Sequence, residues 1–418
     1  MTTVGAATHT PAVKRRGQAD FHKVWAGLTV SLMGSQVTRL ALPLAAALTL
    51  GAGPLEMGLL AAATQAPFLC FSLLAGVWSD RIRRRPVLIA TDVGQAALLS
   101  SIPLTAALGV LRLEQLYTVA FLTGTLQVFY EIAHYSYVPS VVGRERIVTA
   151  NSRIQVSYSA AESAGPGIAG VLVQWLSAPL AVLVDAFSFL VSALCIRAIR
   201  TPEAPPMPPH TSVRSQIAEG MRGLCDHPLL RPIVLASATT GLFNGAIVAI
   251  YVLYAIRALH LSPAMIGLIF ATGGIAAIPG ALLAPRVAQW IGVGPAIVGG
   301  WFVAAGALLL IPLAAGPAVI PILIASQLIA GASGTVANIH QWSLRQVVTP
   351  DRLFGRVTAS HRFIVYGIEA VGGLLGGGLA AMLGLRAAIA LCAVGATLGP
   401  LWALGSPLWR LREQPTRT

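Results

Sequence analysis

Ionisable side chains that interrupt long apolar stretches are the residues of this sequence best suited to chemistry. They are Arg39, Asp92, Glu131, Glu162, Asp185 and Glu369. If the stretches lie in a lipid bilayer, each charge near its centre costs about 3 kcal/mol on insertion scales, so each marks a candidate functional site. A carboxylate in that setting can bind a proton or a cationic ligand.

Glu162 and Glu369 are the first candidates among these carboxylates. Each is followed three residues later by a glycine, Gly165 or Gly372, and the two motifs lie about half the chain length apart. Such spacing indicates pseudo-equivalent positions in an internal repeat, with a site between the repeats. The alternative is that both carboxylates hold structural, water-facing positions.

The other charges have possible partners within the sequence. Arg39 could pair with Glu131 or Asp185, which would keep a buried charge compensated. Asp92 follows a cluster of arginines, Arg83 to Arg85, and we interpret it as a structural partner of that cluster. For Glu131 and Asp185, structural and functional interpretations stay equally open.

Apolar segments long enough to cross a bilayer surround these charges. The chain is 56% hydrophobic and only 10% charged, whereas soluble proteins carry roughly 25% charged residues. A spanning helix needs about 20 apolar residues, and backbone in lipid must satisfy its own hydrogen bonds. We therefore predict an all-α membrane protein with twelve transmembrane helices, approximately at 22–50, 55–78, 87–110, 114–139, 151–176, 179–198, 232–256, 263–288, 294–314, 318–343, 357–383 and 386–408.

The basic residues predict the orientation of these helices. The formal net charge is +13, and most of the 28 Lys and Arg residues fall in loops on one predicted side. Only Arg112, Arg257 and Arg386 fall on the other. Loops rich in Lys and Arg stay in the cytoplasm, so we expect both termini there, in the cell membrane. Because the cations are spread over short loops, the sequence argues against a nucleic-acid partner.

The longest polar segment divides the chain. It is rich in proline at first and then could form a short amphipathic helix from Ser212 to Cys225. We interpret it as a linker between two pseudo-symmetric six-helix bundles. The predicted organisation is an N-terminal tail at 1–21, a bundle at 22–198, the linker at 199–231, a second bundle at 232–409 and a tail at 410–418.

A charged loop between the second and third predicted helices identifies a family. Its residues Gly76, Asp80, Arg81, Arg84 and Arg85 resemble the signature of the major facilitator superfamily. Arg83 replaces the second glycine of that signature, which is similar to the drug- and siderophore-efflux branch with macrolide efflux pumps and the enterobactin exporter. The stretch Val184-Asp185-Ala186-Phe187 looks like that branch too.

The resemblance implies roles for two motifs. Asp80 would latch the two bundles together by meeting the positive N-terminus of a helix from the second bundle, near Arg356. Gly165, Pro166 and Gly170 partly resemble the antiporter motif of the family, with Ala161 in place of a glycine. Simple helix packing explains the same glycines.

These features predict a proton-driven secondary exporter of small hydrophobic molecules of the drug, antibiotic or siderophore type. Its expected partners are the lipid bilayer, a small-molecule substrate and protons, and we expect a monomer. A nutrient or metabolite importer of the same fold is the alternative, and a membrane-embedded enzyme is a more remote one. The sequence has no HExxH motif and no phosphate-binding G-x-x-x-x-G-K-[ST] loop. The four cysteines lack metal-binding spacing, so we expect no metal site and no cofactor.

Overall fold

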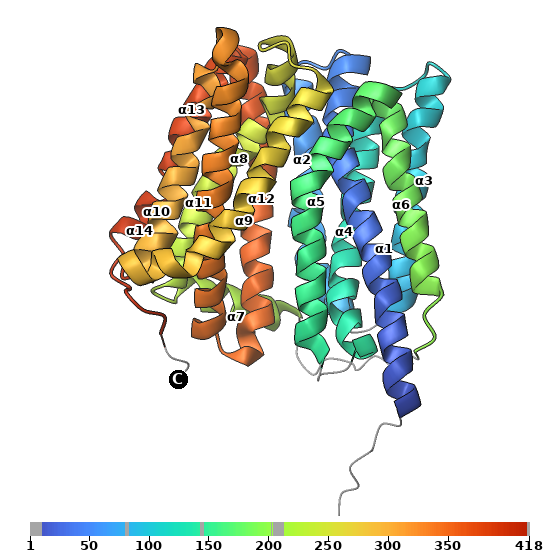
Figure 1. The fold of residues 1–418 in the computed structure, drawn as a ribbon, viewed down its shortest axis with the longest axis vertical. Coiled ribbons are helices and arrows are strands. Elements are labelled where there is room, and N and C mark those ends of the chain that lie inside the picture. The colour runs from blue at the N-terminus through green and yellow to red at the C-terminus, as the bar shows by residue number, and fades with distance from the viewer. Residues whose placement is uncertain (1–10, 80–82, 143–145, 202, 204–212, 416–418) are drawn as a thin grey trace, which may run out of the picture.

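The computed structural model describes residues 11–79, 83–142, 146–201, 203 and 213–415, and within them every regular element is a helix (Figure 1). The first group is α1 (Pro11–Leu44), α2 (Pro54–Ser79), α3 (Arg84–Ala107), α4 (Leu113–Val142), α5 (Ile147–Leu176) and α6 (Ala178–Arg197). The short helix α7 (Val213–Cys225) follows. The second group is α8 (Leu230–Arg257), α9 (Pro263–Ile291), α10 (Val293–Leu308), α11 (Val319–Val348), α12 (Asp351–Leu383), α13 (Leu385–Thr397) and α14 (Leu401–Leu404).

The long helices match the predicted membrane segments. Among the described residues, nine helical segments are long and apolar enough to cross a bilayer. The helices α1, α4 and α5 have sufficient length but are not among those nine. These three carry Arg39, Glu131 and Glu162, whereas Asp92, Asp185 and Glu369 lie in helices that are among the nine. The predicted all-helical membrane fold is confirmed.

Helices within each group pack on one another, and the two groups meet along two seams. We call helices α1–α6 the first half and helices α8–α14 the second half. The seams are α2 against α12 and α5 against α9. By order within each half, α2 corresponds to α9 and α5 corresponds to α12. Exchanging each helix for its counterpart therefore converts one seam into the other, as a pseudo-two-fold axis requires. Figure 1 shows the halves side by side, with α7 beneath them.

The two halves share a hydrophobic core on one side of the molecule only. We call the side where α1 begins and α7 lies the lower side, as in Figure 1, and the opposite side the upper side. One core cluster draws residues from the upper ends of both halves; its members include Leu44, Met57, Ile102, Leu116, Ile250, Tyr254, Ile266 and Ile389. The two lower clusters each belong to a single half. Among the described residues, the halves therefore share a hydrophobic core above but not below.

Candidate functional site between the two halves

A carboxylate of the second half meets an amide of the first half in the α2–α12 seam. Gln65 Nε2 on α2 donates a hydrogen bond of 2.8 Å to Glu369 Oε2 on α12. Nearby in the same seam, the rings of Phe68 and Tyr366 lie 4.9 Å apart between centroids. Arg39 of α1 is exposed and lies near enough for its charge to act on Glu369. Glu369 is thus half-buried at the junction of three helices.

Glycines bring α2 and α12 close enough for this contact. A Cβ atom at Gly58 would lie 2.6 Å from the carbonyl oxygen of Gly373, and one at Gly367 would lie 2.6 Å from Leu69 Cδ1. The first contact is with backbone and leaves no room for a side chain, whereas the second would require Leu69 to move. Small residues let helix backbones approach in this way, and the approach holds Gln65 and Glu369 within hydrogen-bond distance.

An ion pair joins the halves nearer the lower side. Arg362 Nη1 on α12 lies 3.2 Å from Glu131 Oε2 on α4, and both side chains are partly exposed, at 31% and 22%. The Arg362 guanidinium also lies over the ring of Tyr135, 5.5 Å from its centroid. Gln127 donates to the other Glu131 oxygen at 3.3 Å. Partly exposed pairs contribute at most about 1 kcal/mol, so this contact can break and re-form.

Two of the predicted partnerships are wrong. Arg39 pairs with neither Glu131 nor Asp185, because Glu131 is taken by Arg362 and Asp185 by serine hydroxyls. Asp92 does not join the arginine cluster. It is fully buried inside the first half, and Asp185 and Ser192 are its neighbours. Sequence reasoning also missed Arg362, since nothing in the chain shows which helix of the other half faces Glu131.

Glu162 and Glu369 occupy different surroundings despite their matching positions in the repeat. Glu162 is exposed on α5, where the helix backbone closely approaches Gly274 of α9. Glu369 is half-buried and hydrogen-bonded. The structure therefore gives Glu369 the stronger case as a proton or substrate group.

The antiporter-like motif lies at close helix contacts of α5. A Cβ atom at Gly165 would lie 2.5 Å from Gln36 Cγ on α1, and one at Gly170 would lie 2.5 Å from the Pro263 carbonyl oxygen on α9. On the facing helix, a Cβ atom at Gly267 would lie 2.3 Å from the Pro166 carbonyl oxygen. The motif thus sets the approach of α5 to its own half and across the α5–α9 seam.

The loop motif is only partly within the described residues. Gly76 lies in α2, whereas Asp80 and Arg81 fall outside the described part, so the predicted latch stays a prediction. Arg84 and Arg85 begin α3, and their backbone N–H groups donate to the carboxylate of Glu203 at 2.5 and 3.2 Å. An acid at a helix N-terminus satisfies unpaired donors and complements the helix dipole.

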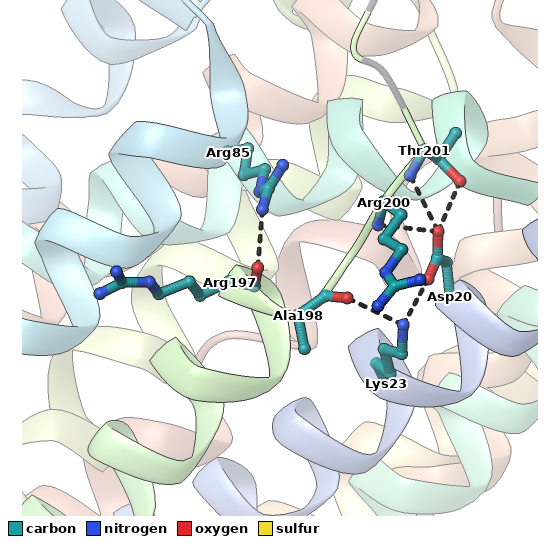
Figure 2. A network of polar contacts seen from close by, with 7 residues as sticks. All are labelled: Asp20, Lys23, Arg85, Arg197, Ala198, Arg200 and Thr201. Atoms are coloured by element: carbon teal, nitrogen blue, oxygen red, sulfur yellow. Dashed lines mark hydrogen bonds and ion pairs between the residues drawn. The ribbon is translucent and has the colours of Figure 1, made fainter.

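The chain that follows α6 is fixed to the first half by a polar network (Figure 2). Asp20 accepts hydrogen bonds from Lys23 Nζ, from the backbone of Arg200 and Thr201, and from the Thr201 hydroxyl. Burial alone would raise the pKa of Asp20, but these bonds hold it below its ordinary value. Arg85 Nη2 adds a bond of 2.7 Å to the Arg197 carbonyl. The start of the linker is therefore part of the first half.

Helix α7, by contrast, is attached to the second half. Glu219 forms an ion pair with Arg356 of α12, the residue that we expected near Asp80. Leu224 is buried in the lower core of the second half beside Val357. Asp20, Glu203 and Glu219 were not identified from the sequence, where they are merely acids near cation-rich loops.

No three His, Cys, Asp or Glu side chains come together as metal ligands would in the part of the chain that the structure describes. Among the described residues, the polar groups near the Glu369 and Glu131 contacts include these carboxylates, the guanidinium groups of Arg39 and Arg362, amides and phenols. Such a set binds protons, charged groups or hydrogen-bonding solutes, and its aromatic rings offer apolar surface.

Comparison with known proteins gives matches along most of the chain. The family model described as Major Facilitator Superfamily matches residues 24–368. The enterobactin exporter EntS of Citrobacter koseri is 25% identical over 333 residues, covering 78% of this chain and 77% of that protein. The multidrug efflux pump Tap of Mycolicibacterium fortuitum is 25% identical, with 80% and 82% covered. A putative sugar efflux transporter of Deinococcus radiodurans is 27% identical, with 93% and 95% covered.

Solved structures share the fold. The nucleoside transporter NupG superposes with a TM-score of 0.72 at 14% identity, covering 94% of this chain and 98% of that one. A bacterial homologue of the iron transporter ferroportin, in an inward-facing state, gives 0.69 at 16% identity, with 92% and 98% covered.

Proposed function

The chain belongs to the major facilitator superfamily, and from that premise we propose that it exports small, mostly hydrophobic molecules, driven by a proton gradient. It is a multi-pass membrane transporter and not an enzyme. The three relatives described above bear the names of an exporter, an efflux pump and an efflux transporter, which supports the outward direction.

The observation that carries the proposal is the one-sided junction of the halves. Their shared core lies on the upper side, and each lower core belongs to one half. Glu369 with Gln65, and Glu131 with Arg362, cross between the halves below that shared core. A polar site at the junction of two bodies that are joined on one side is the geometry of alternating access.

We place the lower side in the cytoplasm, with both chain ends. The cation-rich loops support this orientation, because Lys and Arg near membrane segments favour the cytoplasmic side. On this orientation the conformation described is open inward. A hydrophobic substrate then reaches the site from the cytoplasm or the inner leaflet, as export requires.

The contacts suggest how the conformation changes. The upper seams include close approaches of glycines to the backbone of the facing helix, such as Gly58 to Gly373 and Gly267 to Pro166, and we propose that the helices part there. The lower ion pair between Glu131 and Arg362 is partly exposed and can adjust as the lower ends approach. Glu369, once exposed to the outside, would take up a proton and release it inward on the return.

Transport in inside-out vesicles tests the proposal, with a fluorescent hydrophobic cation as substrate. Glu369→Gln keeps the hydrogen-bonding shape but removes the titratable group, so we expect gradient-driven uptake to fall at least about tenfold, the scale of lost transition-state contacts. The matched control is Glu114→Gln, an exposed glutamate on the upper end of α4, which should retain activity.

Three results would each contradict a part of the proposal. Uptake that persists when the proton gradient is collapsed would exclude proton coupling. Uptake only in right-side-out vesicles would favour the nutrient or metabolite importer. Full activity in Glu369→Gln would show that this carboxylate does not take part in proton coupling. The direction of transport would then be tested only by comparing the two vesicle orientations.

A further inference from the structure

A second set of polar side chains lies inside the first half, away from the junction of the halves. We call it the inner cluster and define it as Asp92 on α3, Tyr130 and His134 on α4, and Asp185 and Ser192 on α6. Each is at most 5% exposed. The Tyr130 and His134 rings are stacked, with centroids 5.8 Å apart. None of these residues has a role in the site described above.

Asp185 is provided with hydrogen-bond donors. Ser188 Oγ lies 3.1 Å from Asp185 Oδ1 and 2.8 Å from the Asp185 carbonyl oxygen, so its one proton is shared between these two acceptors. Ser35 Oγ from α1 lies 3.4 Å from Asp185 Oδ1. A Cβ atom at Gly34 of α1 would lie 2.1 Å from Ser188 Oγ and 2.7 Å from Asp185 Oδ1, so a side chain there would displace this hydroxyl and carboxylate. Hydroxyl donors stabilise an ionised carboxylate, so Asp185 is equipped to keep a negative charge.

Asp92 has no such support. It is 0% exposed, and neither carboxylate oxygen makes a hydrogen bond within the part of the chain that the structure describes. The Ser192 hydroxyl lies alongside without hydrogen-bond geometry. The titratable groups that face Asp92 are Asp185 from α6 and Tyr130 from α4, and no described Lys or Arg forms an ion pair with it.

Two buried acids without a cation cannot both be ionised at a modest cost. Removing an unpaired carboxylate from water costs several kcal/mol even after relaxation, and a second negative charge nearby adds to the cost. The neutral acid avoids both penalties. Asp185 has two serine hydroxyls within hydrogen-bond distance, whereas neither oxygen of Asp92 has a partner in hydrogen-bond geometry among the described residues, so the geometry assigns the charge to Asp185 and the proton to Asp92.

We propose that Asp92 is a proton-binding site inside the first half, occupied in this conformation, with Asp185 as its ionised partner. The proton is taken from water by the Asp92 carboxylate and returned to water, with no other bond formed or broken. Tyr130, His134 and Tyr137 lie at intervals of four and three residues on α4, and they form a row of exchangeable groups toward the lower end. As part of the coupling cycle, the site rests on the proposed export function.

Infrared spectroscopy of the purified full-length protein in liposomes, without substrate, tests the occupancy directly. A buried protonated carboxyl group gives a carbonyl band distinct from that of carboxylates. We expect this band to be lost or reduced in Asp92→Asn and unchanged in Glu114→Gln. Because asparagine resembles the neutral acid, Asp92→Asn should also fold normally. An unchanged band in a folded Asp92→Asn protein would overturn the proposal.

Chemical labelling of the parent protein gives a test that needs no variant. Dicyclohexylcarbodiimide reacts with protonated carboxyl groups in apolar surroundings, and peptide mapping should find it on Asp92 but not on Asp185. Label on Asp185 alone would overturn the assignment. If the infrared carbonyl band is assigned to Asp92 but transport does not depend on the proton gradient, the proton-binding site is supported and proton-driven export is contradicted. The failure of one proposal can therefore be distinguished from the failure of the other.

Discussion

Charge compensation at single residues differs between the two places where acids lie in this protein. At the junction of the halves, Glu131 has a guanidinium and Glu369 an amide, and both are partly open to solvent. In the inner cluster, Asp92 is sealed and has neither kind of partner. Partly exposed pairs can exchange partners as the halves move, whereas a fully buried acid without a partner can only bind or release a proton. Carboxyl groups are therefore suited to two kinds of chemistry in this protein.

The ion pair between Glu131 and Arg362 gives a prediction at this scale. Glu131→Arg or Arg362→Glu alone places like charges together, and we expect at least about a fivefold loss of transport from like-charge repulsion. The double exchange restores an opposite pair and should recover most of the rate. Transport rates of the four proteins in vesicles form a double-mutant cycle. Additive losses would show that the two residues act independently.

The sequence could identify those residues whose neighbours along the chain are sufficient to mark them as unusual. Arg39, Glu131, Asp185 and Glu369 are charges in apolar segments, and that anomaly was enough to select them. Their partners depend on which helix faces which across the junction. No local pattern encodes that register, so Gln65, Arg362 and the isolation of Asp92 emerged only from the structure.

At the scale of elements, glycines decide how the helices meet. The α2–α12 and α5–α9 seams are held together where backbones touch, at Gly58 and Gly373 and at Gly170 and Gly267. The apolar length of each segment predicted the helices and the amphipathic pattern predicted α7, because both signals are local. The resemblance predicted that the end of the second span meets a helix of the other half near Arg356, but it did not predict the glycine contacts along the seams, since a glycine in a helix can equally mark a bend, a contact or nothing.

Gly267→Ala tests the role of the α5–α9 seam. The added Cβ atom would lie 2.3 Å from the Pro166 carbonyl oxygen, so it should push the upper ends apart and favour the outward-open conformation. We expect a cysteine placed on the upper part of the seam to react faster with a hydrophilic thiol reagent. Gly306→Ala is the matched control, because nothing lies within 4 Å of its new Cβ atom. Equal effects of the two substitutions would argue against a steric role for the seam.

At the scale of the whole molecule, the upper side is the closed side of the described conformation. Contacts between the halves there include Arg257 of α8, whose Nη2 donates to the carbonyl oxygens of Gly51 and Ala52. The backbone N–H of Ala264 likewise donates to Gln174 Oε1 at 3.2 Å. Transport by alternating access requires that all these contacts separate in every cycle.

Cross-linking across the upper side tests that requirement. After replacement of Cys70, Cys195, Cys225 and Cys392, cysteines at Gln174 and Ala264 can be joined by a short reducible cross-linker. We expect cross-linking to abolish transport and reduction to restore it.

The control joins two helices of one half on the same side. Gln115 and Ser101 lie on α4 and α3, with Gln115 Nε2 3.2 Å from Ser101 Oγ, so their cross-link should leave transport intact. Inhibition by both cross-links, or by neither, would contradict a cycle in which the halves part on the upper side.

The attachment of the linker at its two ends has a mechanical consequence. Glu203 is bonded to the start of α3 in the first half, and α7 is bound to α12 in the second half. A fully extended chain advances about 3.5 Å per residue, so the segment from Glu203 to Val213 can reach on the order of 35 Å at most. The segment is thus a tether of fixed maximum length. It sets an upper limit on how far apart the attachment points on the two halves can move.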